Sequence, residues 1–299
     1  MTDSDLPLVD AHQHLWNLDE NYYPWLSDKV APAAWGSYDA LLRNYTIDDY
    51  LRDADGQNLV KSVHLDVGWD PRDPVGETRW LQQIADQHGF PHGIVGYADL
   101  SMPDVAEVLD AHAEHANFRG IRQSMNYHPD EAKTYQSRPE VSRTPEWRRG
   151  FRELRNRGLS FDLQLYYPQM AEFYDLAREF PDVQIILNHT GMQVDGPDHF
   201  GRWREGMRLL AQAPNVACKI SGLGMGDHHW TTESVRPYVE TALECFGAER
   251  CMVASNFPVD SLFSDFGRIF DAFREITRDY SWSERMALFH NNAVSFYRL

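Results

Sequence analysis

The sequence predicts an α/β protein folded as one (β/α)8 barrel, the TIM-barrel class. Eight short runs rich in Val, Ile and Leu alternate with helical runs over the 299 residues, the order expected of parallel strands covered by helices. A doubly wound sheet is the alternative, but it usually has a Gly-x-Gly-x-x-Gly turn after its first strand, and none follows residues 8–14. The length suggests two domains. Because α/β barrels of about 250 residues form one domain, we predict a single domain over residues 1–299.

The predicted strands show little alternation of apolar and polar residues, as expected where both faces of a parallel sheet are buried. Parallel strands direct their carboxyl ends to one face of a barrel, and polar residues at that face indicate an active site. In chain order, the strands are predicted over residues 8–14, 62–67, 94–100, 118–125, 161–166, 183–189, 216–221 and 251–256.

Start and stop signals bound the predicted helices. The first opens after Asp73-Pro74 and closes with Gly89, the order of proline and glycine that helices favour. The helices are predicted over residues 76–88, 104–115, 145–156, 169–179, 201–212, 232–246, 264–277 and 283–297. Two long connections each follow a strand: residues 15–46, rich in Trp and Tyr, and the polar residues 126–144. Both are predicted to cover the carboxyl-terminal face, where long loops carry function.

Composition excludes several classes of partner. Lys and Arg number 28 against 45 Asp and Glu, a formal net charge of −17, which argues against binding to nucleic acid or to an anionic membrane surface. We expect a small-molecule partner and leave homo-oligomer formation open. The three cysteines show no CxxC spacing, the N-terminus lacks a signal-peptide pattern, and no apolar run reaches about 18 residues, so we expect a cytoplasmic protein without a zinc ribbon.

The segment DAHQH, residues 10–14, is the strongest catalytic signal. Residues two apart on a strand point to the same side, so His12 and His14 are predicted to present two imidazoles together; two polar groups on a strand edge are the structural alternative. His189 ends the sixth strand and is the third candidate, with a buried histidine bonded to the backbone as its alternative. Three converging histidines can bind one divalent metal such as zinc or polarise a carbonyl without a metal.

Five further residues are predicted to bind substrate. Arg122 ends the fourth strand, where its planar fork suits a carboxylate or lactone oxygen, with a surface ion pair as the alternative. Lys219 lies in the apolar seventh strand and is expected either to contact the ligand or to form an ion pair inside the barrel. Tyr166 ends the fifth strand as an aromatic wall, His64 lies on the second strand, and His128 lies in the loop after the fourth.

The eighth predicted strand ends at Asn256, where a barrel hydrolase could place its general base. An amide cannot take up a proton at any useful pH. Asp260 follows four residues later in the turn. It is predicted to be either the base or the cap of the following helix.

Five segments, in this order, resemble the amidohydrolase superfamily. They are VDAHQHLW, FRGIRQS, LNHTG, KISGL and ASNFPVD, beginning at residues 9, 118, 187, 219 and 254. Within the superfamily they are similar to the amidohydrolase 2 lactonase group, which includes L-fuconolactonases, L-rhamnonolactonases, sulfomuconolactonases and pyrone-dicarboxylate lactonases. The aromatic NYYPWL after the histidine pair and the C-terminal NNAVSFYRL fit the same group. The resemblance implies a barrel like that of the metal-dependent hydrolases.

The resemblance also implies roles for individual residues. His12, His14 and His189 would surround the substrate carbonyl, with one divalent metal or without any, and Arg122 would bind substrate. Two departures matter. Where binuclear members carry a further histidine, the strand after His189 offers only Lys and Ser, so a two-metal centre is not expected. Where the family pattern reads Ser-Asp-Phe/Trp-Pro and the Asp activates water, this chain has Asn256, which is predicted to orient a water or to ligate a metal through its amide oxygen.

Three hypotheses from different classes follow. The first is hydrolysis of a small lactone or related cyclic ester, with Asp260, His64 or His128 replacing the missing base. The second is decarboxylation or another C–C or C–O lyase reaction on the same barrel, where no water need be deprotonated; the loss of the Asp motivates it. The third is a small-molecule binding protein on a former enzyme scaffold, against which three converging imidazoles argue.

Overall fold

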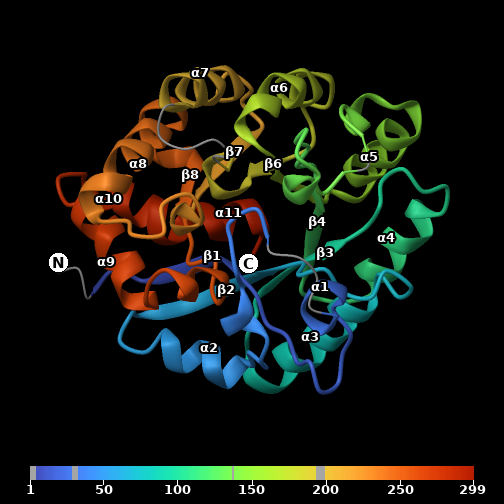
Figure 1. Cartoon of the computed structure of the whole chain (residues 1–299), viewed down its shortest axis with the longest axis horizontal. Coiled ribbons are helices and arrows are strands. Elements are labelled where there is room, and N and C mark those ends of the chain that lie inside the picture. Colours follow the sequence, from blue (N-terminus) through green and yellow to red (C-terminus); the bar gives the residue numbers. More distant parts are fainter. Residues whose placement is uncertain (1–4, 29–32, 137, 193–198) are drawn as a thin grey trace.

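The computed structural model describes residues 5–28, 33–136, 138–192 and 199–299. Eight strands form one sheet in the order β1 to β8, and each strand pairs in parallel with the next. The helices surround this sheet (Figure 1). The predicted (β/α)8 barrel is confirmed.

The strands are shorter than predicted at the end that matters for function. Their bounds are β1 (Leu8–Gln13), β2 (Leu59–Leu65), β3 (Gly93–Tyr97), β4 (Phe118–Ser124), β5 (Ser160–Gln164), β6 (Ile185–Leu187), β7 (Val216–Ile220) and β8 (Cys251–Val253). His14, His189 and Asn256 therefore lie just beyond their strands rather than inside them. His189 and Asn256 have φ angles of 53° and 57°, a left-handed conformation that no strand accommodates.

The predicted helices are present, with two additional helices before β2 and a division of the last predicted helix. The helices are α1 (Pro24–Ser27), α2 (Ile47–Asp53), α3 (Gly76–His88), α4 (Val105–Ala113), α5 (Pro145–Arg157), α6 (Met170–Glu179), α7 (Phe200–Leu210), α8 (Thr232–Phe246), α9 (Phe266–Ile276), α10 (Trp282–Met286) and α11 (Asn292–Tyr297). The unpredicted α2 begins at a capping box in which Thr46 and Asp49 satisfy each other's backbone N–H groups. The last predicted helix is divided by a π-helical turn, Ala287–Asn291. None of the helices among the described residues is long and apolar enough to cross a lipid bilayer.

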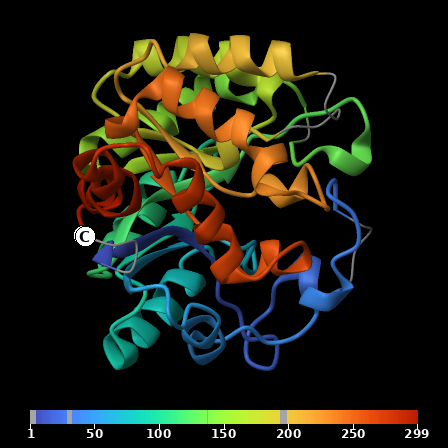
Figure 2. The ribbon, with the colours of Figure 1, turned by 90° about the vertical axis from the view of Figure 1, so that its left-hand side faces the viewer.

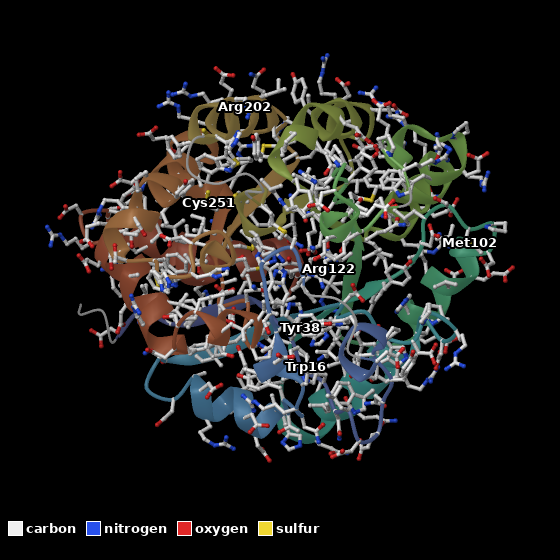
Figure 3. All side chains as sticks on the ribbon, in the orientation of Figure 1. Trp16, Tyr38, Met102, Arg122, Arg202 and Cys251 are labelled. Carbon is white, nitrogen blue, oxygen red and sulfur yellow. The ribbon has the colours of Figure 1, made fainter. Side chains whose placement is uncertain are left out.

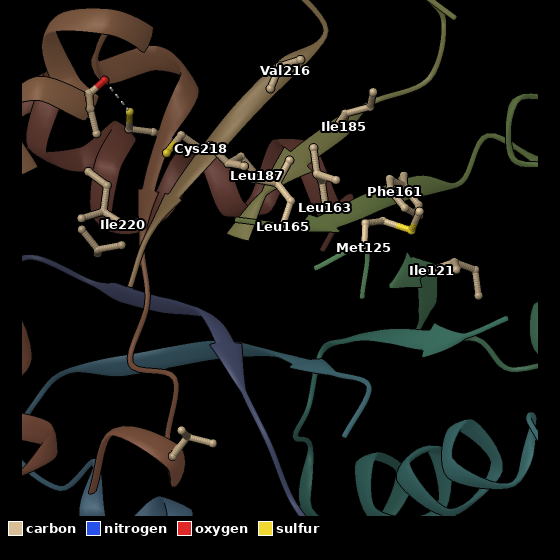
Figure 4. Packing of buried hydrophobic residues seen from close by; sticks show 14 of the residues in the cluster. Ile121, Met125, Phe161, Leu163, Leu165, Ile185, Leu187, Val216, Cys218 and Ile220 are labelled. Carbon is tan, nitrogen blue, oxygen red and sulfur yellow. Dashed lines mark hydrogen bonds between the residues drawn. The ribbon is translucent and has the colours of Figure 1, made fainter. Parts of the chain in front are cut away.

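Two apolar layers hold the barrel together. The outer layer joins the strands to the helices, and Figure 4 shows part of it: Ile185 and Leu187 of β6 beside Val216, Cys218 and Ile220 of β7. Alternate residues of the strands face the barrel interior and, with Ala254 just after β8 and with Ala293 and Tyr297 of α11, form the inner cluster. The strand residues in it are Val9, Ala11, Val63, Leu65, Val95, Ile186, Ala217 and Met252. The alternation of inward and outward residues is that of strands buried on both faces.

The C-terminal segment closes the amino-terminal end of the barrel. Ala293 and Tyr297 of α11 belong to the inner cluster, and Leu299 packs against Gly93 at the start of β3, where a Cβ would lie only 2.9 Å from the leucine side chain. In Figure 2 the C-terminus lies on the left, whereas the connection after β1, in blue, extends to the right. The long loops therefore lie at the opposite, carboxyl-terminal end of the barrel, as predicted.

Candidate active site

The barrel closes where the chain after β8 meets β1, and this seam positions the predicted catalytic residues. The backbone N–H of His14 donates to the carbonyl of Phe257 (2.7 Å), and that of Asn256 donates to the carbonyl of His12 (2.8 Å). Two backbone hydrogen bonds thus fix the histidine pair beside Asn256.

Asp10 ties the same seam together from its outer side. Its Oδ1 accepts the backbone N–H of Ser255 (2.9 Å), and its Oδ2 accepts the hydroxyls of Ser255 (2.6 Å) and Tyr50 (2.9 Å). Burial raises the pKa of Asp10 to about 6, although these hydrogen bonds oppose the shift. Tyr50 belongs to α2, so the unpredicted helix also supports the site.

His12 and His14 present their ring nitrogens to each other. The two Nε2 atoms are 3.2 Å apart, and both side chains are buried. His14 Nδ1 lies 2.8 Å from the carbonyl of Leu65. A carbonyl accepts only, so the Nδ1 of a neutral His14 carries the proton and its Nε2 offers a lone pair. The predicted pairing of these imidazoles is present.

His189 reaches the same cluster from the turn after β6. Its ring centroid lies 4.4 Å from that of His12, and its Nδ1 lies 2.9 Å from the hydroxyl of Ser221. The left-handed backbone of His189 is a strained conformation of the kind that functional sites retain. Gly222 has a φ of 64°, and a Cβ there would lie 2.6 Å from His189 Nδ1, so only glycine lets the imidazole approach this turn.

The three histidines are neutral at physiological pH. Burial is the largest cause that lowers the pKa of each well below its usual value. Positive neighbours add to the effect: Lys219 for His12 and His189, and Arg122 for His14. A neutral imidazole can accept a proton or bind a metal, and a charged one can do neither.

Asn256 and Asp260 form a hydrogen-bonded pair. Asn256 Nδ2 donates to Asp260 Oδ2 at 2.5 Å, so the amide oxygen of Asn256 is left to face another group. Burial raises the pKa of Asp260 to about 7, although the hydrogen bonds from Asn256 and from the backbone of Gly224 oppose the shift. Asn256 lines the pocket described next, whereas Asp260 lies behind it. As a base, Asp260 would have to act across the Asn256 amide.

A pocket of about 350 Å³ opens above these residues, within the range of small-molecule sites. Its lining includes the polar side chains of His14, His189, Arg122, Asn256, Asp66, Gln164, Ser124 and Thr134. Arg122 lies near the centre of the view along the barrel in Figure 3. Its Nη1 donates to Gln164 Oε1 (3.0 Å), and its Nε lies 3.5 Å from Asp66 Oδ2. Arg122 is thus at the mouth, as predicted, but its charge is partly compensated there.

Four of the five residues predicted to bind substrate do not line this pocket: Lys219, His64, Tyr166 and His128. Lys219 points into the barrel interior, where Nζ donates to Asp162 Oδ1 at 2.6 Å and both side chains are fully buried. Tyr297 also donates to this oxygen, at 2.7 Å. Burial lowers the pKa of Lys219 to about 8, although Asp162 opposes the shift. Of the two alternatives for Lys219, the structure has the ion pair inside the barrel.

His64 has both ring nitrogens engaged in the core. Its Nδ1 accepts the backbone N–H of Leu15 (3.2 Å), so its Nε2 holds the proton and faces Glu77 Oε1 (3.2 Å). Neither nitrogen is left for a substrate or for a water. The position of His64 therefore does not support the predicted contact with substrate or the role of replacement base.

Tyr166 and His128 lie beside one another, with ring centroids 6.3 Å apart. Tyr166 lines a smaller chamber of about 40 Å³ that His189 also lines. Tyr166 is therefore close to the pocket wall at which it was predicted. Its hydroxyl donates to the carbonyl of Lys133 (2.6 Å). His128 accepts the backbone N–H of Asp130 (3.0 Å) and is not among the residues that line either chamber.

Glu77 is a buried carboxyl group that no sequence pattern singles out. Its Oε1 accepts the backbone N–H of Val67 (3.1 Å), and its carboxyl bonds to that of Asp66. Burial and the adjacent Asp66 raise its pKa well above the usual value. Glu77 lies in the first turn of α3, and the amphipathic pattern of that helix does not distinguish a buried acid there from an exposed one.

The donor set fits part of a zinc site. Tetrahedral zinc with Zn–N bonds of about 2.0–2.1 Å would hold two nitrogens about 3.3 Å apart, close to the 3.2 Å between His12 and His14. The Leu65 carbonyl fixes the orientation of the His14 ring, as hydrogen-bond acceptors behind metal ligands do. Among the described residues, however, no three His, Cys, Asp or Glu side chains are arranged to hold a metal. The set of three histidine ligands stays a prediction, of which the nitrogen spacing of His12 and His14 matches two members.

Comparisons with known proteins agree with the fold and the motifs. The family model described as Amidohydrolase matches residues 9–299. The protein y4mH of Sinorhizobium fredii, named as uncharacterized, is 67% identical over 99% of this chain and 100% of its own length. An L-fucono-1,5-lactonase of Burkholderia ambifaria is 26% identical over 97% of this chain and 95% of its own.

Solved structures show the same architecture. An amidohydrolase of Burkholderia multivorans, crystallised with bound zinc, superposes with a TM-score of 0.81 at 24% identity over 98% of this chain and 99% of its own. The fold, the ordered motifs and the match of the family model over nearly the whole chain lead to one conclusion. The protein belongs to the amidohydrolase family and is an enzyme of the hydrolase type.

Proposed function

We propose that the protein hydrolyses a small lactone or a related cyclic ester. The observation that carries the proposal is the convergence of His14, His189, Arg122 and Asn256 on one pocket. These side chains follow or end β1, β6, β4 and β8, the carboxyl ends at which barrel enzymes place their chemistry. The similarity to L-fucono-1,5-lactonases supports the same reaction class.

Arg122 is the residue we assign to the substrate carbonyl. In this tautomer His14 Nε2 carries no proton and cannot donate a hydrogen bond to a substrate oxygen. The histidine pair therefore does not polarise a carbonyl directly. Arg122 has five N–H donors, of which Nη1 is committed to Gln164. Its remaining donors and its positive charge suit the oxyanion that forms when water attacks the carbonyl carbon.

His189 is the residue we assign to proton transfer. It lines the pocket, it is neutral, and its Nδ1 is held by Ser221, which leaves Nε2 for a water oriented by the Asn256 amide oxygen. The water gives its proton to Nε2 as its oxygen bonds to the carbonyl carbon. The same proton then passes to the ring oxygen as the lactone C–O bond breaks, which yields a hydroxy acid.

A divalent metal would be held by His12 and His14 through their facing Nε2 atoms. Such a metal supplies Lewis acidity and lowers the pKa of a bound water to about 7. With or without a metal, Arg122 binds the substrate carbonyl, Asn256 orients the water and His189 accepts its proton.

The test is ring opening of a lactone panel, followed by proton release in weak buffer with and without a chelator. We expect turnover by the wild type and a loss of at least about 100-fold in His189→Ala, the usual range for a general base. His128→Ala is the matched control and should stay near wild-type activity. No turnover across sugar lactones, muconolactones and aromatic lactones would refute the proposal.

A second reaction class, decarboxylation or another lyase step, is favoured by one observation, the amide at position 256. Asn256→Asp separates the two classes. It places two carboxyls within hydrogen-bonding distance at Asp260, so they share a proton and one stays a base near neutral pH. Under the hydrolase proposal, Asn256→Asp raises lactone hydrolysis, whereas Asn256→Ala does not. Release of carbon dioxide by the wild type, with no gain of hydrolysis in Asn256→Asp, would favour the lyase instead.

A further inference from the structure

The pocket of about 350 Å³ has two chemically different ends. The reacting groups named above lie at its base. Other walls come from the connection after β1 and from that after β4. The side chains of this second part, which we call the aromatic end, are Trp25, Trp35, Tyr38 and Tyr135.

The polar atoms of the aromatic end are used to build the wall. Trp25 Nε1 donates to the carbonyl of Val67 (2.6 Å), and the Tyr38 hydroxyl donates to the carbonyl of Trp25 (3.0 Å). Tyr135 and Trp35 bond to each other through their side chains, so the two connections meet over the pocket. A ligand at this end therefore meets mainly ring surfaces, although the hydroxyl side chains of Ser124 and Thr134 also line the pocket.

The ionic groups of the pocket compensate each other. Among the described residues that line it, Asp66 and Arg122 are the charged ones, and they face each other at 3.5 Å. An anionic substituent at Arg122 would compete with Asp66 for the guanidinium. Lys133 does not line this pocket; it lines the smaller chamber, which shares Trp35 and His189 with the pocket.

We infer that the substrate is an uncharged lactone that carries an aromatic ring or another flat apolar group, rather than a polyhydroxylated sugar lactone or a polyanion. The inference rests on the proposed function. The lactone carbonyl lies at Arg122 and His189, and the apolar group stacks on Trp35 and its neighbours, which favour such offset contacts. A sugar hydroxyl placed there would leave water without gaining a partner.

The first experiment compares two lactones with six-membered rings. Dihydrocoumarin carries a fused benzene ring, and gluconolactone carries hydroxyls. We expect kcat/KM for dihydrocoumarin to exceed that for gluconolactone by at least about tenfold, the discrimination that a pocket of this kind supplies. An equal or reversed ratio overturns the inference.

Substitutions at Trp35 test whether the preference for dihydrocoumarin over gluconolactone depends on the aromatic end. Trp35→Ala should raise KM for dihydrocoumarin with little change in kcat, and should leave gluconolactone unaffected. Trp35→Phe keeps a ring and should restore most of the difference. Trp282→Ala, on α10 and outside the pocket, is the matched control for removal of a partly buried indole. An equal loss for both lactones in Trp35→Ala would indicate a merely structural role and would contradict the stacking.

A binding measurement separates this inference from the proposed function. Lactams keep the ring and the carbonyl but resist hydrolysis, so dihydroquinolinone and gluconolactam can be titrated by calorimetry and by tryptophan fluorescence. Tighter binding of dihydroquinolinone by about tenfold or more, with no lactone opened, would refute the hydrolase and keep the inference. Binding of neither lactam, or binding of gluconolactam that is equal or tighter, overturns the inference whether or not lactones are hydrolysed.

Discussion

Asn256 and Asp260 show at the residue scale how this site departs from its family pattern. The chain has an amide at position 256, and the buried carboxyl group of Asp260 lies one turn onward and behind that amide. The strand-end positions of His12, His14, His189 and Arg122 could be predicted, because polar groups at those ends of a barrel face its mouth. The partners of His64 and Lys219 could not, because Glu77 and Asp162 come from distant segments that alternation alone does not align.

Asp260→Asn is expected to change how stability depends on pH. The folded-state pKa of Asp260 is raised from 3.8 to about 7, so the folded chain binds this proton more tightly than the unfolded chain. The corresponding stability is complete below about pH 4 and is lost as the pH rises through about 7. At about 1.4 kcal/mol per pKa unit, the wild type should lose up to about 4 kcal/mol relative to Asp260→Asn over this range.

Urea unfolding at several pH values measures this difference. Asp279→Asn, at a side chain that is 90% exposed, is the matched control and should follow the wild type. Parallel stability curves for the wild type and Asp260→Asn would contradict the burial of a titrating carboxyl behind Asn256.

At the scale of elements, the strands were predicted in number, order and direction, but not at their carboxyl ends. The predicted sixth and eighth strands run on to His189 and Asn256, because apolar runs give no signal for a left-handed residue. The helix α2 was missed because its seven residues follow a long aromatic connection and are too short to show a clear period. The carboxyl ends of these strands and the helix α2 all position residues of the candidate active site.

The ion pair between β5 and β7 gives a prediction at this scale. Lys219→Met leaves Asp162 charged and unpaired in the barrel interior, which should cost about 3–5 kcal/mol of unfolding free energy. The double variant Lys219→Met/Asp162→Leu removes both charges and should recover much of that loss. Lys61→Met, at a half-buried position of β2, is the control.

Chemical denaturation of the four proteins tests the pair. A stable Lys219→Met whose only defect is a raised KM would instead indicate that Lys219 contacts substrate.

At the scale of the whole molecule, the net charge of −17 describes the surface better than the site. Neutral histidines and a compensated Arg122–Asp66 pair make up most of the polar base of the pocket. Burial rather than composition decides these charge states, so no count of residues could have predicted them. The long aromatic connection was predicted to cover the mouth, and it supplies most of the aromatic end.

Metal binding is a further prediction for the whole protein. After removal of metal with a chelator, we expect the wild type to bind zinc through the facing Nε2 atoms of His12 and His14, and His12→Ala to bind at least about tenfold more weakly. Competition with a chromophoric chelator measures this without an activity assay. His128→Ala is the control, and equal zinc affinity in His12→Ala would contradict the assignment.

The central claim is that water attacks a lactone carbonyl in the pocket at the seam of β1 and β8. Its most direct test is ring opening of a lactone in water labelled with the heavy oxygen isotope, followed by mass spectrometry of the product. The account predicts one labelled oxygen in the new carboxylate for each turnover by the wild type, and only the uncatalysed background with His189→Ala. Unlabelled product, release of carbon dioxide, or equal labelling by His189→Ala would contradict it.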